Sequence, residues 1–243
     1  MTHPWIAAFA LAAGLAGGAQ TAAEPVVRSP YPAMAPLAQY AMTRDDEIAM
    51  ARSAAPAAIA SAAEVMALTD RGYETVVKGS NGFVCLVERA WADDVRNDGF
   101  WNPKLRGPLC FNPAAARSVL PAYLERTGWV LAGASRAEIE QRVVAAIAAG
   151  RYTPPATGAM AFMLSKMGYL GDEAGGPWHP HVMVFQSAAA GGPESWGANA
   201  PGAPVMASVD PVEPVVTFYI PVAKWSDGTP DGASTPADQM TMQ

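Results

Sequence analysis

The sequence predicts an α+β fold, in which a single domain holds a mostly antiparallel sheet, a few helices and one disulfide. Short strand-like runs occupy residues 65–87, helical patterns follow at 112–149, and further strand-like runs lie within 160–222. Strands, then helices, then strands along a chain of 243 residues are typical of a single α+β domain.

The N-terminus has the features of a secretory signal peptide, which we predict to span residues 1–23. Its apolar run over 6–15 is too short to cross a bilayer and is followed by small residues. Cleavage after Ala19 or Ala23 would leave an exported protein, periplasmic or extracellular. An uncleaved anchor or a buried N-terminal helix is the alternative.

Four prolines mark residues 24–42 as an extended lead-in, because proline blocks helix propagation. The globular domain is predicted at 43–225. The tail at 226–243 has no large aliphatic or aromatic side chain, and we expect it to be disordered.

The first helix is predicted over 44–55, because Thr43 can cap it and three acidic residues follow in its first turn. Three strand-like runs come next, at 65–68, 73–77 and 83–87. An Asn-Gly dipeptide precedes the third run and favours a tight hairpin. We therefore expect a three-stranded antiparallel meander.

Helices are expected in the middle of the chain. The Asn-Pro pair at 112–113 begins a helix that Pro121 breaks or kinks. Ser135 and Glu138 have the spacing of a capping box, which starts a helix over 136–149. The later strands are predicted at 160–165, 181–187, 205–209 and 215–222.

Export would place Cys85 and Cys110 in an oxidising compartment, where two cysteines are expected to form a disulfide. Closing the intervening stretch, which we interpret as a loop, would stabilise the fold by about 3–4 kcal/mol. Two free buried thiols are the alternative.

Composition and motifs exclude several function classes. The chain has 16 Lys and Arg against 22 Asp and Glu, with no basic cluster, so no nucleic-acid partner is expected. No apolar run long enough to span a membrane follows the leader. No nucleotide-binding or nucleophile-elbow motif is present. The sequence therefore assigns no catalytic residue. A Ser–His–Asp hydrolase using His181 is a third hypothesis.

His179 and His181 are the histidines that remain beyond the leader. On an extended segment both imidazoles point the same way, so both could bind one metal ion. Met183 shares their face, and its thioether would favour copper over zinc. Two histidines do not complete a site, and the alternative is a strand entry with half-solvated histidines.

Tryptophans in loops offer a second kind of site. Trp178 and Trp196 could stack on a ligand beside His179 and His181, although they could equally cap the sheet core. We therefore expect an exported binding or structural module, in preference to an enzyme, with an unknown ligand or protein partner. No cofactor is predicted; the alternative is a metal-binding protein or metal-dependent enzyme that uses His179 and His181.

Three stretches resemble a family of secreted bacterial proteins of uncharacterised function. They are Gly79 to Val87, Trp178 to Met183 and Trp225 to Gly228. The family shares an Asn-Gly-Phe-x-Cys-Leu-Val stretch and a later Pro-His-x-Met stretch. The resemblance covers roughly residues 49–228, which is most of the expected mature chain. It implies export and a single domain, and it implies no catalytic residue, cofactor or partner.

Overall fold

One curved sheet organises the protein. A computed structural model describes residues 30–92, 94–172 and 179–232, and within them the sheet has eight strands in the order β2-β1-β3-β4-β5-β6-β8-β7. All neighbouring strands are antiparallel except β1 and β3. The strands are β1 (Glu64–Thr69), β2 (Gly72–Val77), β3 (Val84–Glu88), β4 (Gly107–Phe111), β5 (Met160–Met163), β6 (His181–Ser187), β7 (Met206–Val209) and β8 (Val215–Pro221). The predicted α+β fold with a mostly antiparallel sheet is confirmed.

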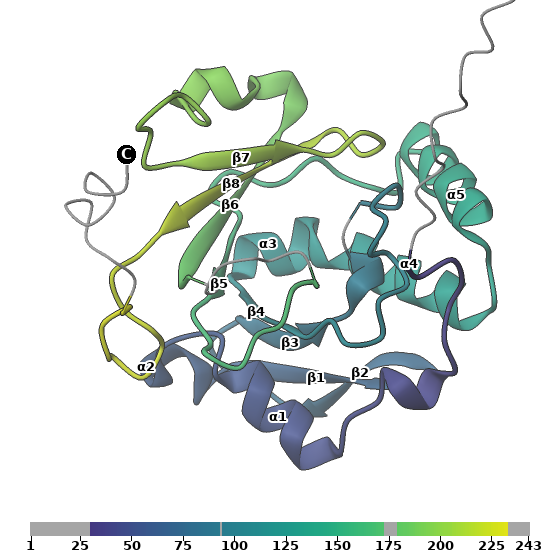
Figure 1. The fold of residues 1–243 in the computed structure, drawn as a ribbon, viewed down its shortest axis with the longest axis horizontal. Helices are drawn as coiled ribbons and strands as arrows, with labels where there is room; N and C mark the ends of the chain where they lie inside the picture. Colours follow the sequence, from purple (N-terminus) through teal and green to yellow (C-terminus); the bar gives the residue numbers. More distant parts are fainter. Residues whose placement is uncertain (1–29, 93, 173–178, 233–243) are drawn as a thin grey trace, which may run out of the picture.

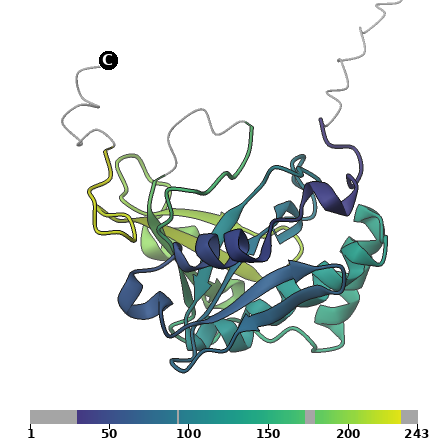
Figure 2. The ribbon, with the colours of Figure 1, turned by 90° about the horizontal axis from the view of Figure 1, so that it is seen from below.

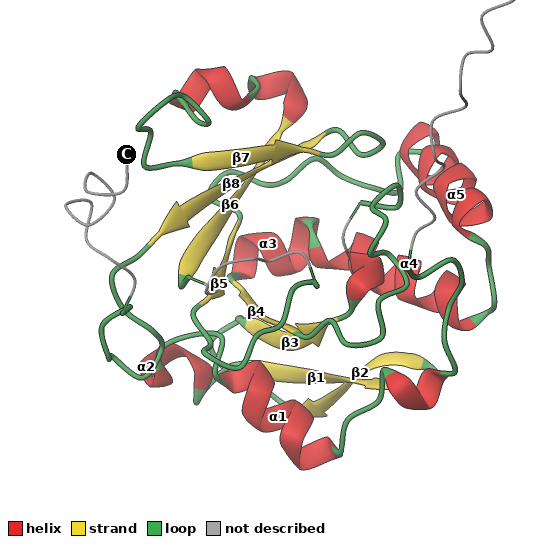
Figure 3. Cartoon of the chain, viewed as in Figure 1, coloured by secondary structure: helices red, strands yellow, loops and turns green. Residues whose placement is uncertain are grey.

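Helices cover both faces of the first half of the sheet (Figures 1 and 3). The helices α1 (Arg44–Arg52) and α2 (Ala57–Ala60) pack on one face, against Val65, Val87 and the two cysteines. Figure 2 shows α1 in front when the molecule is seen from below. The helices α3 (Pro113–Ser118) and α4 (Leu120–Leu131) pack on the other face, and α5 (Arg136–Ala148) contacts α4. The last three strands, β6, β8 and β7, extend beyond this layered part.

The predicted meander is half right. β1 and β2 form the expected antiparallel hairpin, but β3 pairs with β1 in parallel instead of with β2. The connection runs back to the start of β1, where a Cβ on Gly79 would lie 2.1 Å from the backbone nitrogen of Glu64. The Asn81 side chain donates a 2.8 Å hydrogen bond to the Ile59 carbonyl and holds the chain there. Local turn chemistry thus predicted a hairpin, whereas the chain crosses the end of β1, where the backbone of Ser80 also donates to the Ala62 carbonyl.

The stretch between the cysteines also differs from its predicted loop, because it ends in β4. All five residues of β4 are buried, and the strand lies at the centre of the sheet between β3 and β5. Cys85 and Cys110 form the predicted disulfide. They are register partners on β3 and β4, so the bond joins two neighbouring central strands. The strand begins with Gly-Pro, a pair typical of turns, so the sequence pattern did not indicate a strand there.

The predicted helix starts agree with the structure, whereas α1 ends at Arg52, before the predicted end at residue 55. The Thr43 side chain caps α1 and the Asn112 side chain caps α3. The chain breaks between α3 and α4 at Val119, two residues before Pro121. Ser135 and Glu138 form the full capping box of α5. Within the described ranges, no helix is both long and apolar enough to cross a membrane.

The described ends of the chain pack on the domain. The lead-in carries the short 3-10 helix η1 (Leu37–Gln39) and buries Tyr40 completely, in a cluster with Trp91 and Val143. After β8, the backbone of Asp231 donates to the Ala223 carbonyl, so hydrogen-bonded structure continues beyond the predicted start of the tail. The predicted signal peptide and the end of the tail lie outside the described residues.

Candidate ligand-binding site

A cavity of about 640 Å³ lies against the second half of the sheet. Strands β6, β8 and β7 contribute alternate residues to its wall, as expected for one face of a sheet. These residues are His181, Met183, Phe185, Val215, Thr217, Tyr219, Met206 and Ser208. The volume is within the range of about 300–1,000 Å³ that small-molecule sites occupy.

The facing wall comes from α4 and from the chain that follows β3. Tyr123 and Arg126 project from α4, and Glu88 lies at the end of β3. Burial raises the pKa of the Tyr123 hydroxyl well above its ordinary value, so this group stays neutral. The lining combines apolar side chains, such as Met183 and Phe185, with many polar and ionisable ones.

His181 is the imidazole best placed for chemistry. Its Nδ1 lies 2.9 Å from the His179 carbonyl oxygen, which can only accept, so Nδ1 carries the proton in the neutral ring. Nε2 is therefore the nitrogen with the lone pair. Burial lowers the pKa of His181, which favours this neutral form. The ring stands edge-on to Tyr219, with 5.7 Å between centroids.

The polar groups around His181 do not follow the pattern of a Ser–His–Asp triad. In such a triad an aspartate orients Nδ1–H, whereas here a backbone carbonyl does so. The hydroxyl of Ser208, the serine of the cavity wall, is 3.0 Å from the Tyr219 hydroxyl. Ser135 is a helix cap, as the sequence indicated. The hydrolase hypothesis gains no support from this arrangement.

A buried ion pair crosses one end of the cavity. Arg126 of α4 pairs with Glu213, and both side chains are largely buried. The Arg126 guanidinium also donates a 2.9 Å hydrogen bond to the Ala92 carbonyl. Burial raises the pKa of Glu213, although the charge of Arg126 opposes that rise. The pair ties α4 to the segment that leads into β8.

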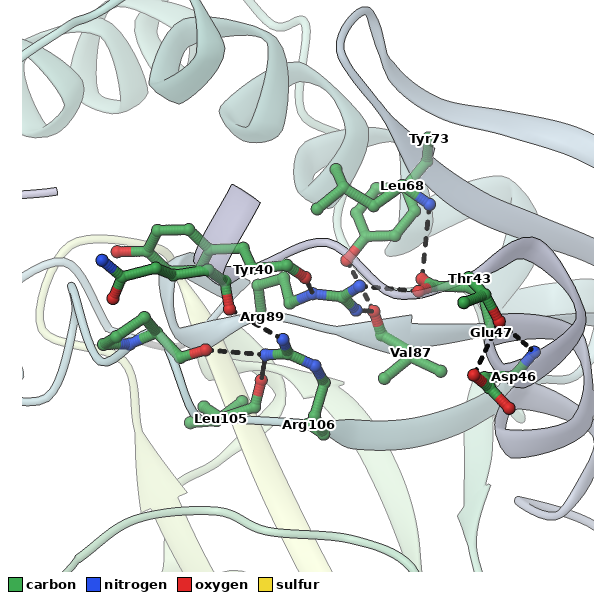
Figure 4. Close-up of polar contacts among 12 residues, drawn as sticks. Tyr40, Thr43, Asp46, Glu47, Leu68, Tyr73, Val87, Arg89, Leu105 and Arg106 are labelled. Atoms are coloured by element: carbon green, nitrogen blue, oxygen red, sulfur yellow. Dashed lines mark hydrogen bonds and ion pairs between the residues drawn. The ribbon is translucent and has the colours of Figure 1, made fainter. Parts of the chain in front are cut away.

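A second buried ion pair stands behind the wall (Figure 4). Arg89, which also borders the cavity, lies 2.7 Å from Glu47 of α1, and neither side chain is more than 2% exposed. Arg89 further donates to the carbonyls of Tyr40 and Val87. The nearby Arg106 is partly buried, and burial lowers its pKa to about 10. Arg89 thus fixes α1 and the lead-in to the end of β3.

The described lining residues carry more acid than base. They include four carboxylates, from Glu88, Asp94, Asp210 and Glu213, and two guanidinium groups. Both guanidinium groups are ion-paired, Arg126 with Glu213 and Arg89 with Glu47 behind the wall. The cavity is therefore a poor environment for an anion.

The structure keeps the two histidines and Met183 at one cavity but places Trp196 elsewhere. His181 and Met183 lie on the cavity wall, and His179 borders the cavity, with its Nδ1 2.9 Å from an Asp231 carboxylate oxygen. Trp196 instead stacks on Phe218 at 4.3 Å, on the opposite face of the sheet. Trp178 lies outside the described residues. The grouping of Trp196 with the histidines therefore has no geometric basis.

Several site residues escaped sequence analysis. Strand alternation could have grouped Thr217 with Tyr219, but it could not say which face of β8 is hollow. Arg126 and Glu213 are 87 positions apart, and no local pattern joins them. Met163 was inside a predicted strand, but its position beside His181 depends on the pairing of β5 with β6.

Among the described residues, no group of three or more His, Cys, Asp and Glu side chains is arranged to hold a metal ion. Comparison with protein-family models, curated proteins and solved structures gave no match.

Proposed function

We propose that this protein is an exported binding module whose cavity holds a small organic molecule, neutral or cationic, with a substantial apolar part. The observation that carries the proposal is the cavity of about 640 Å³, walled by alternate residues of three strands and by α4. The disulfide and the predicted signal peptide support export.

The lining supports the ligand class. Met183, Phe185 and Val215 offer an apolar surface on which the body of a ligand can be buried. Tyr219, Ser208 and His181 supply hydrogen-bonding groups on the same face. The excess of carboxylates disfavours anionic ligands and favours a positive or neutral polar group.

The rigid setting of the cavity supports binding. Both arginines of the lining are held in buried ion pairs, and Arg89 also bonds two backbone carbonyls. A wall that keeps its shape without the ligand loses little conformational entropy on binding, which favours affinity.

A thermal-shift screen tests the proposal. The purified protein, in buffer with a metal chelator, is heated with a library of small molecules sorted into anions, neutral molecules and cations. A ligand at about 100 times its dissociation constant should add about 2.7 kcal/mol to the free energy of unfolding. We expect the compounds that raise the melting temperature to be neutral or cationic.

A cavity-filling variant supplies the control. Thr217→Phe places a ring in the cavity from the middle of β8 and should abolish the shifts. Thr75→Phe makes the same change on an exposed position of β2 and should leave them intact. Shifts that persist in Thr217→Phe, or that come mainly from anions, would refute the proposed site.

A further inference from the structure

The wall of the cavity brings one imidazole and two thioethers together from two neighbouring strands. Met163 of β5 is the register partner of His181 of β6, so their Cβ atoms are about 4.5–5.5 Å apart. Met183 is two residues further along β6 on the same face, a distance of about 7 Å. All three side chains line the cavity.

We propose that His181, Met163 and Met183 form a binding site for Cu(I). Thioethers are soft ligands that select Cu(I), and imidazole suits copper as well. Both methionines belong to the same buried cluster, with exposed fractions of 2% and 5%, so a bound ion would be shielded from water. Methionine has three rotatable bonds, which allow both sulfur atoms to turn toward one ion.

The ring of His181 is prepared for this role. Its Nδ1–H donates to the His179 carbonyl, so the lone pair of the neutral ring is on Nε2. Such an outer hydrogen bond fixes the ring orientation of many metal-binding histidines. Thiolates do not compete for the ion, because Cys85 and Cys110 are joined in the disulfide.

The ligand set differs from the one that the sequence indicated. His179 keeps a carboxylate partner in Asp231, and its side chain is 45% exposed. Met163 takes its place in the site, and only the pairing of β5 with β6 brings it there. The described residues contain no group of three or more His, Cys, Asp and Glu side chains that could hold a metal ion. That finding does not bear on this site, because two of its three ligands are methionine thioethers.

Competition with a chromophoric Cu(I) chelator, bicinchoninate, tests the proposal. The full chain with its disulfide is titrated with Cu(I) under ascorbate and without oxygen. We expect one Cu(I) per chain, with a dissociation constant below about 1 μM. Met163→Leu, Met183→Leu and His181→Gln should each weaken binding by about tenfold or more.

Met206→Leu is the matched control, because Met206 borders the same cavity from β7, two strands away from β6. It should bind Cu(I) as the unmodified protein does. Methionine and leucine have similar volumes, so these variants are expected to fold. Unchanged affinity in both Met163→Leu and Met183→Leu, equal losses in Met206→Leu, or Zn²⁺ binding as tight as Cu(I) would overturn the site. The Cu(I) site shares His181 and Met183 with the wall proposed to hold the organic ligand. The two proposals are tested separately, because the ligand screen contains a metal chelator and the Cu(I) titration contains no organic ligand.

Discussion

Glu47→Gln is expected to lower the free energy of unfolding by about 3 kcal/mol, because it leaves the charge of Arg89 buried without its carboxylate. The two side chains are 0% and 2% exposed, and their nearest charged atoms are 2.7 Å apart. Removing one member of such a pair usually costs about 3–5 kcal/mol. The lower end applies here, because the glutamine oxygen can still accept from the guanidinium in place of Glu47 Oε2. The side-chain NH2 then faces the Leu68 backbone N–H, which lies 3.3 Å from Oε1 of Glu47, so that weaker hydrogen bond is lost.

Urea unfolding followed by tryptophan fluorescence measures this loss. Trp91 is fully buried and packs against Tyr40, which Arg89 also bonds, so its emission reports on this region. With a slope of about 1–3 kcal/mol per molar urea, the midpoint should fall by roughly 1–3 M. The melting temperature should fall by roughly 6–12 °C for a domain of this size.

Glu74→Gln is the matched control. Glu74 pairs with Arg71 at the surface, where the two side chains are 39% and 75% exposed. Exposed pairs contribute about 0–1 kcal/mol, so this change should be almost silent. If Glu47→Gln costs no more than Glu74→Gln, burial of the Arg89 pair does not produce the penalty and the reasoning is wrong.

Three further changes probe the fold. Reduction of the disulfide should lower the free energy of unfolding by about 3–4 kcal/mol in urea titrations with and without dithiothreitol, and equal midpoints would contradict this. Ser135→Ala should cost about 1 kcal/mol by removing the cap of α5, as measured by thermal melting at pH 7. Hydrogen bonds from the Ser135 backbone and side chain lower the pKa of Glu138. The stability that ionised Glu138 adds is therefore present above the ordinary glutamate pKa and is lost as pH falls through the lowered value. The cost of Ser135→Ala should therefore shrink in acid. Gly79→Ala should destabilise the fold by about 1–3 kcal/mol, because the added Cβ would clash with the backbone of Glu64. Gly128→Ala places a Cβ in open space on a helix and should stabilise the fold by up to about 1 kcal/mol. Similar melting temperatures for the two variants would exclude the tight crossing before β3.

The sequence by itself determined the features that depend on neighbouring residues. Thr43, Asn112 and Ser135 each cap the helix predicted for them, because capping needs a side chain and the backbone only three positions later. The β-rich runs predicted at 181–187 and 215–222 correspond to β6 and β8. The disulfide needed only two cysteines and an expected oxidising compartment.

Tertiary structure decided everything that depends on which segments lie side by side. β3 pairs with β1 in parallel, and the contacts of Ser80 and Asn81 with the end of α2 and the chain after it accompany this pairing; a turn pattern does not contain them. The pairing of β5 with β6 places Met163 beside His181, whereas Trp196 lies on the opposite face of the sheet, against Phe218. Side chains alternate between the two faces of a strand with a period of two, whether a face lines a cavity or packs in the core. The period therefore could not reveal the cavity, which depends on the curvature of the sheet and the position of α4.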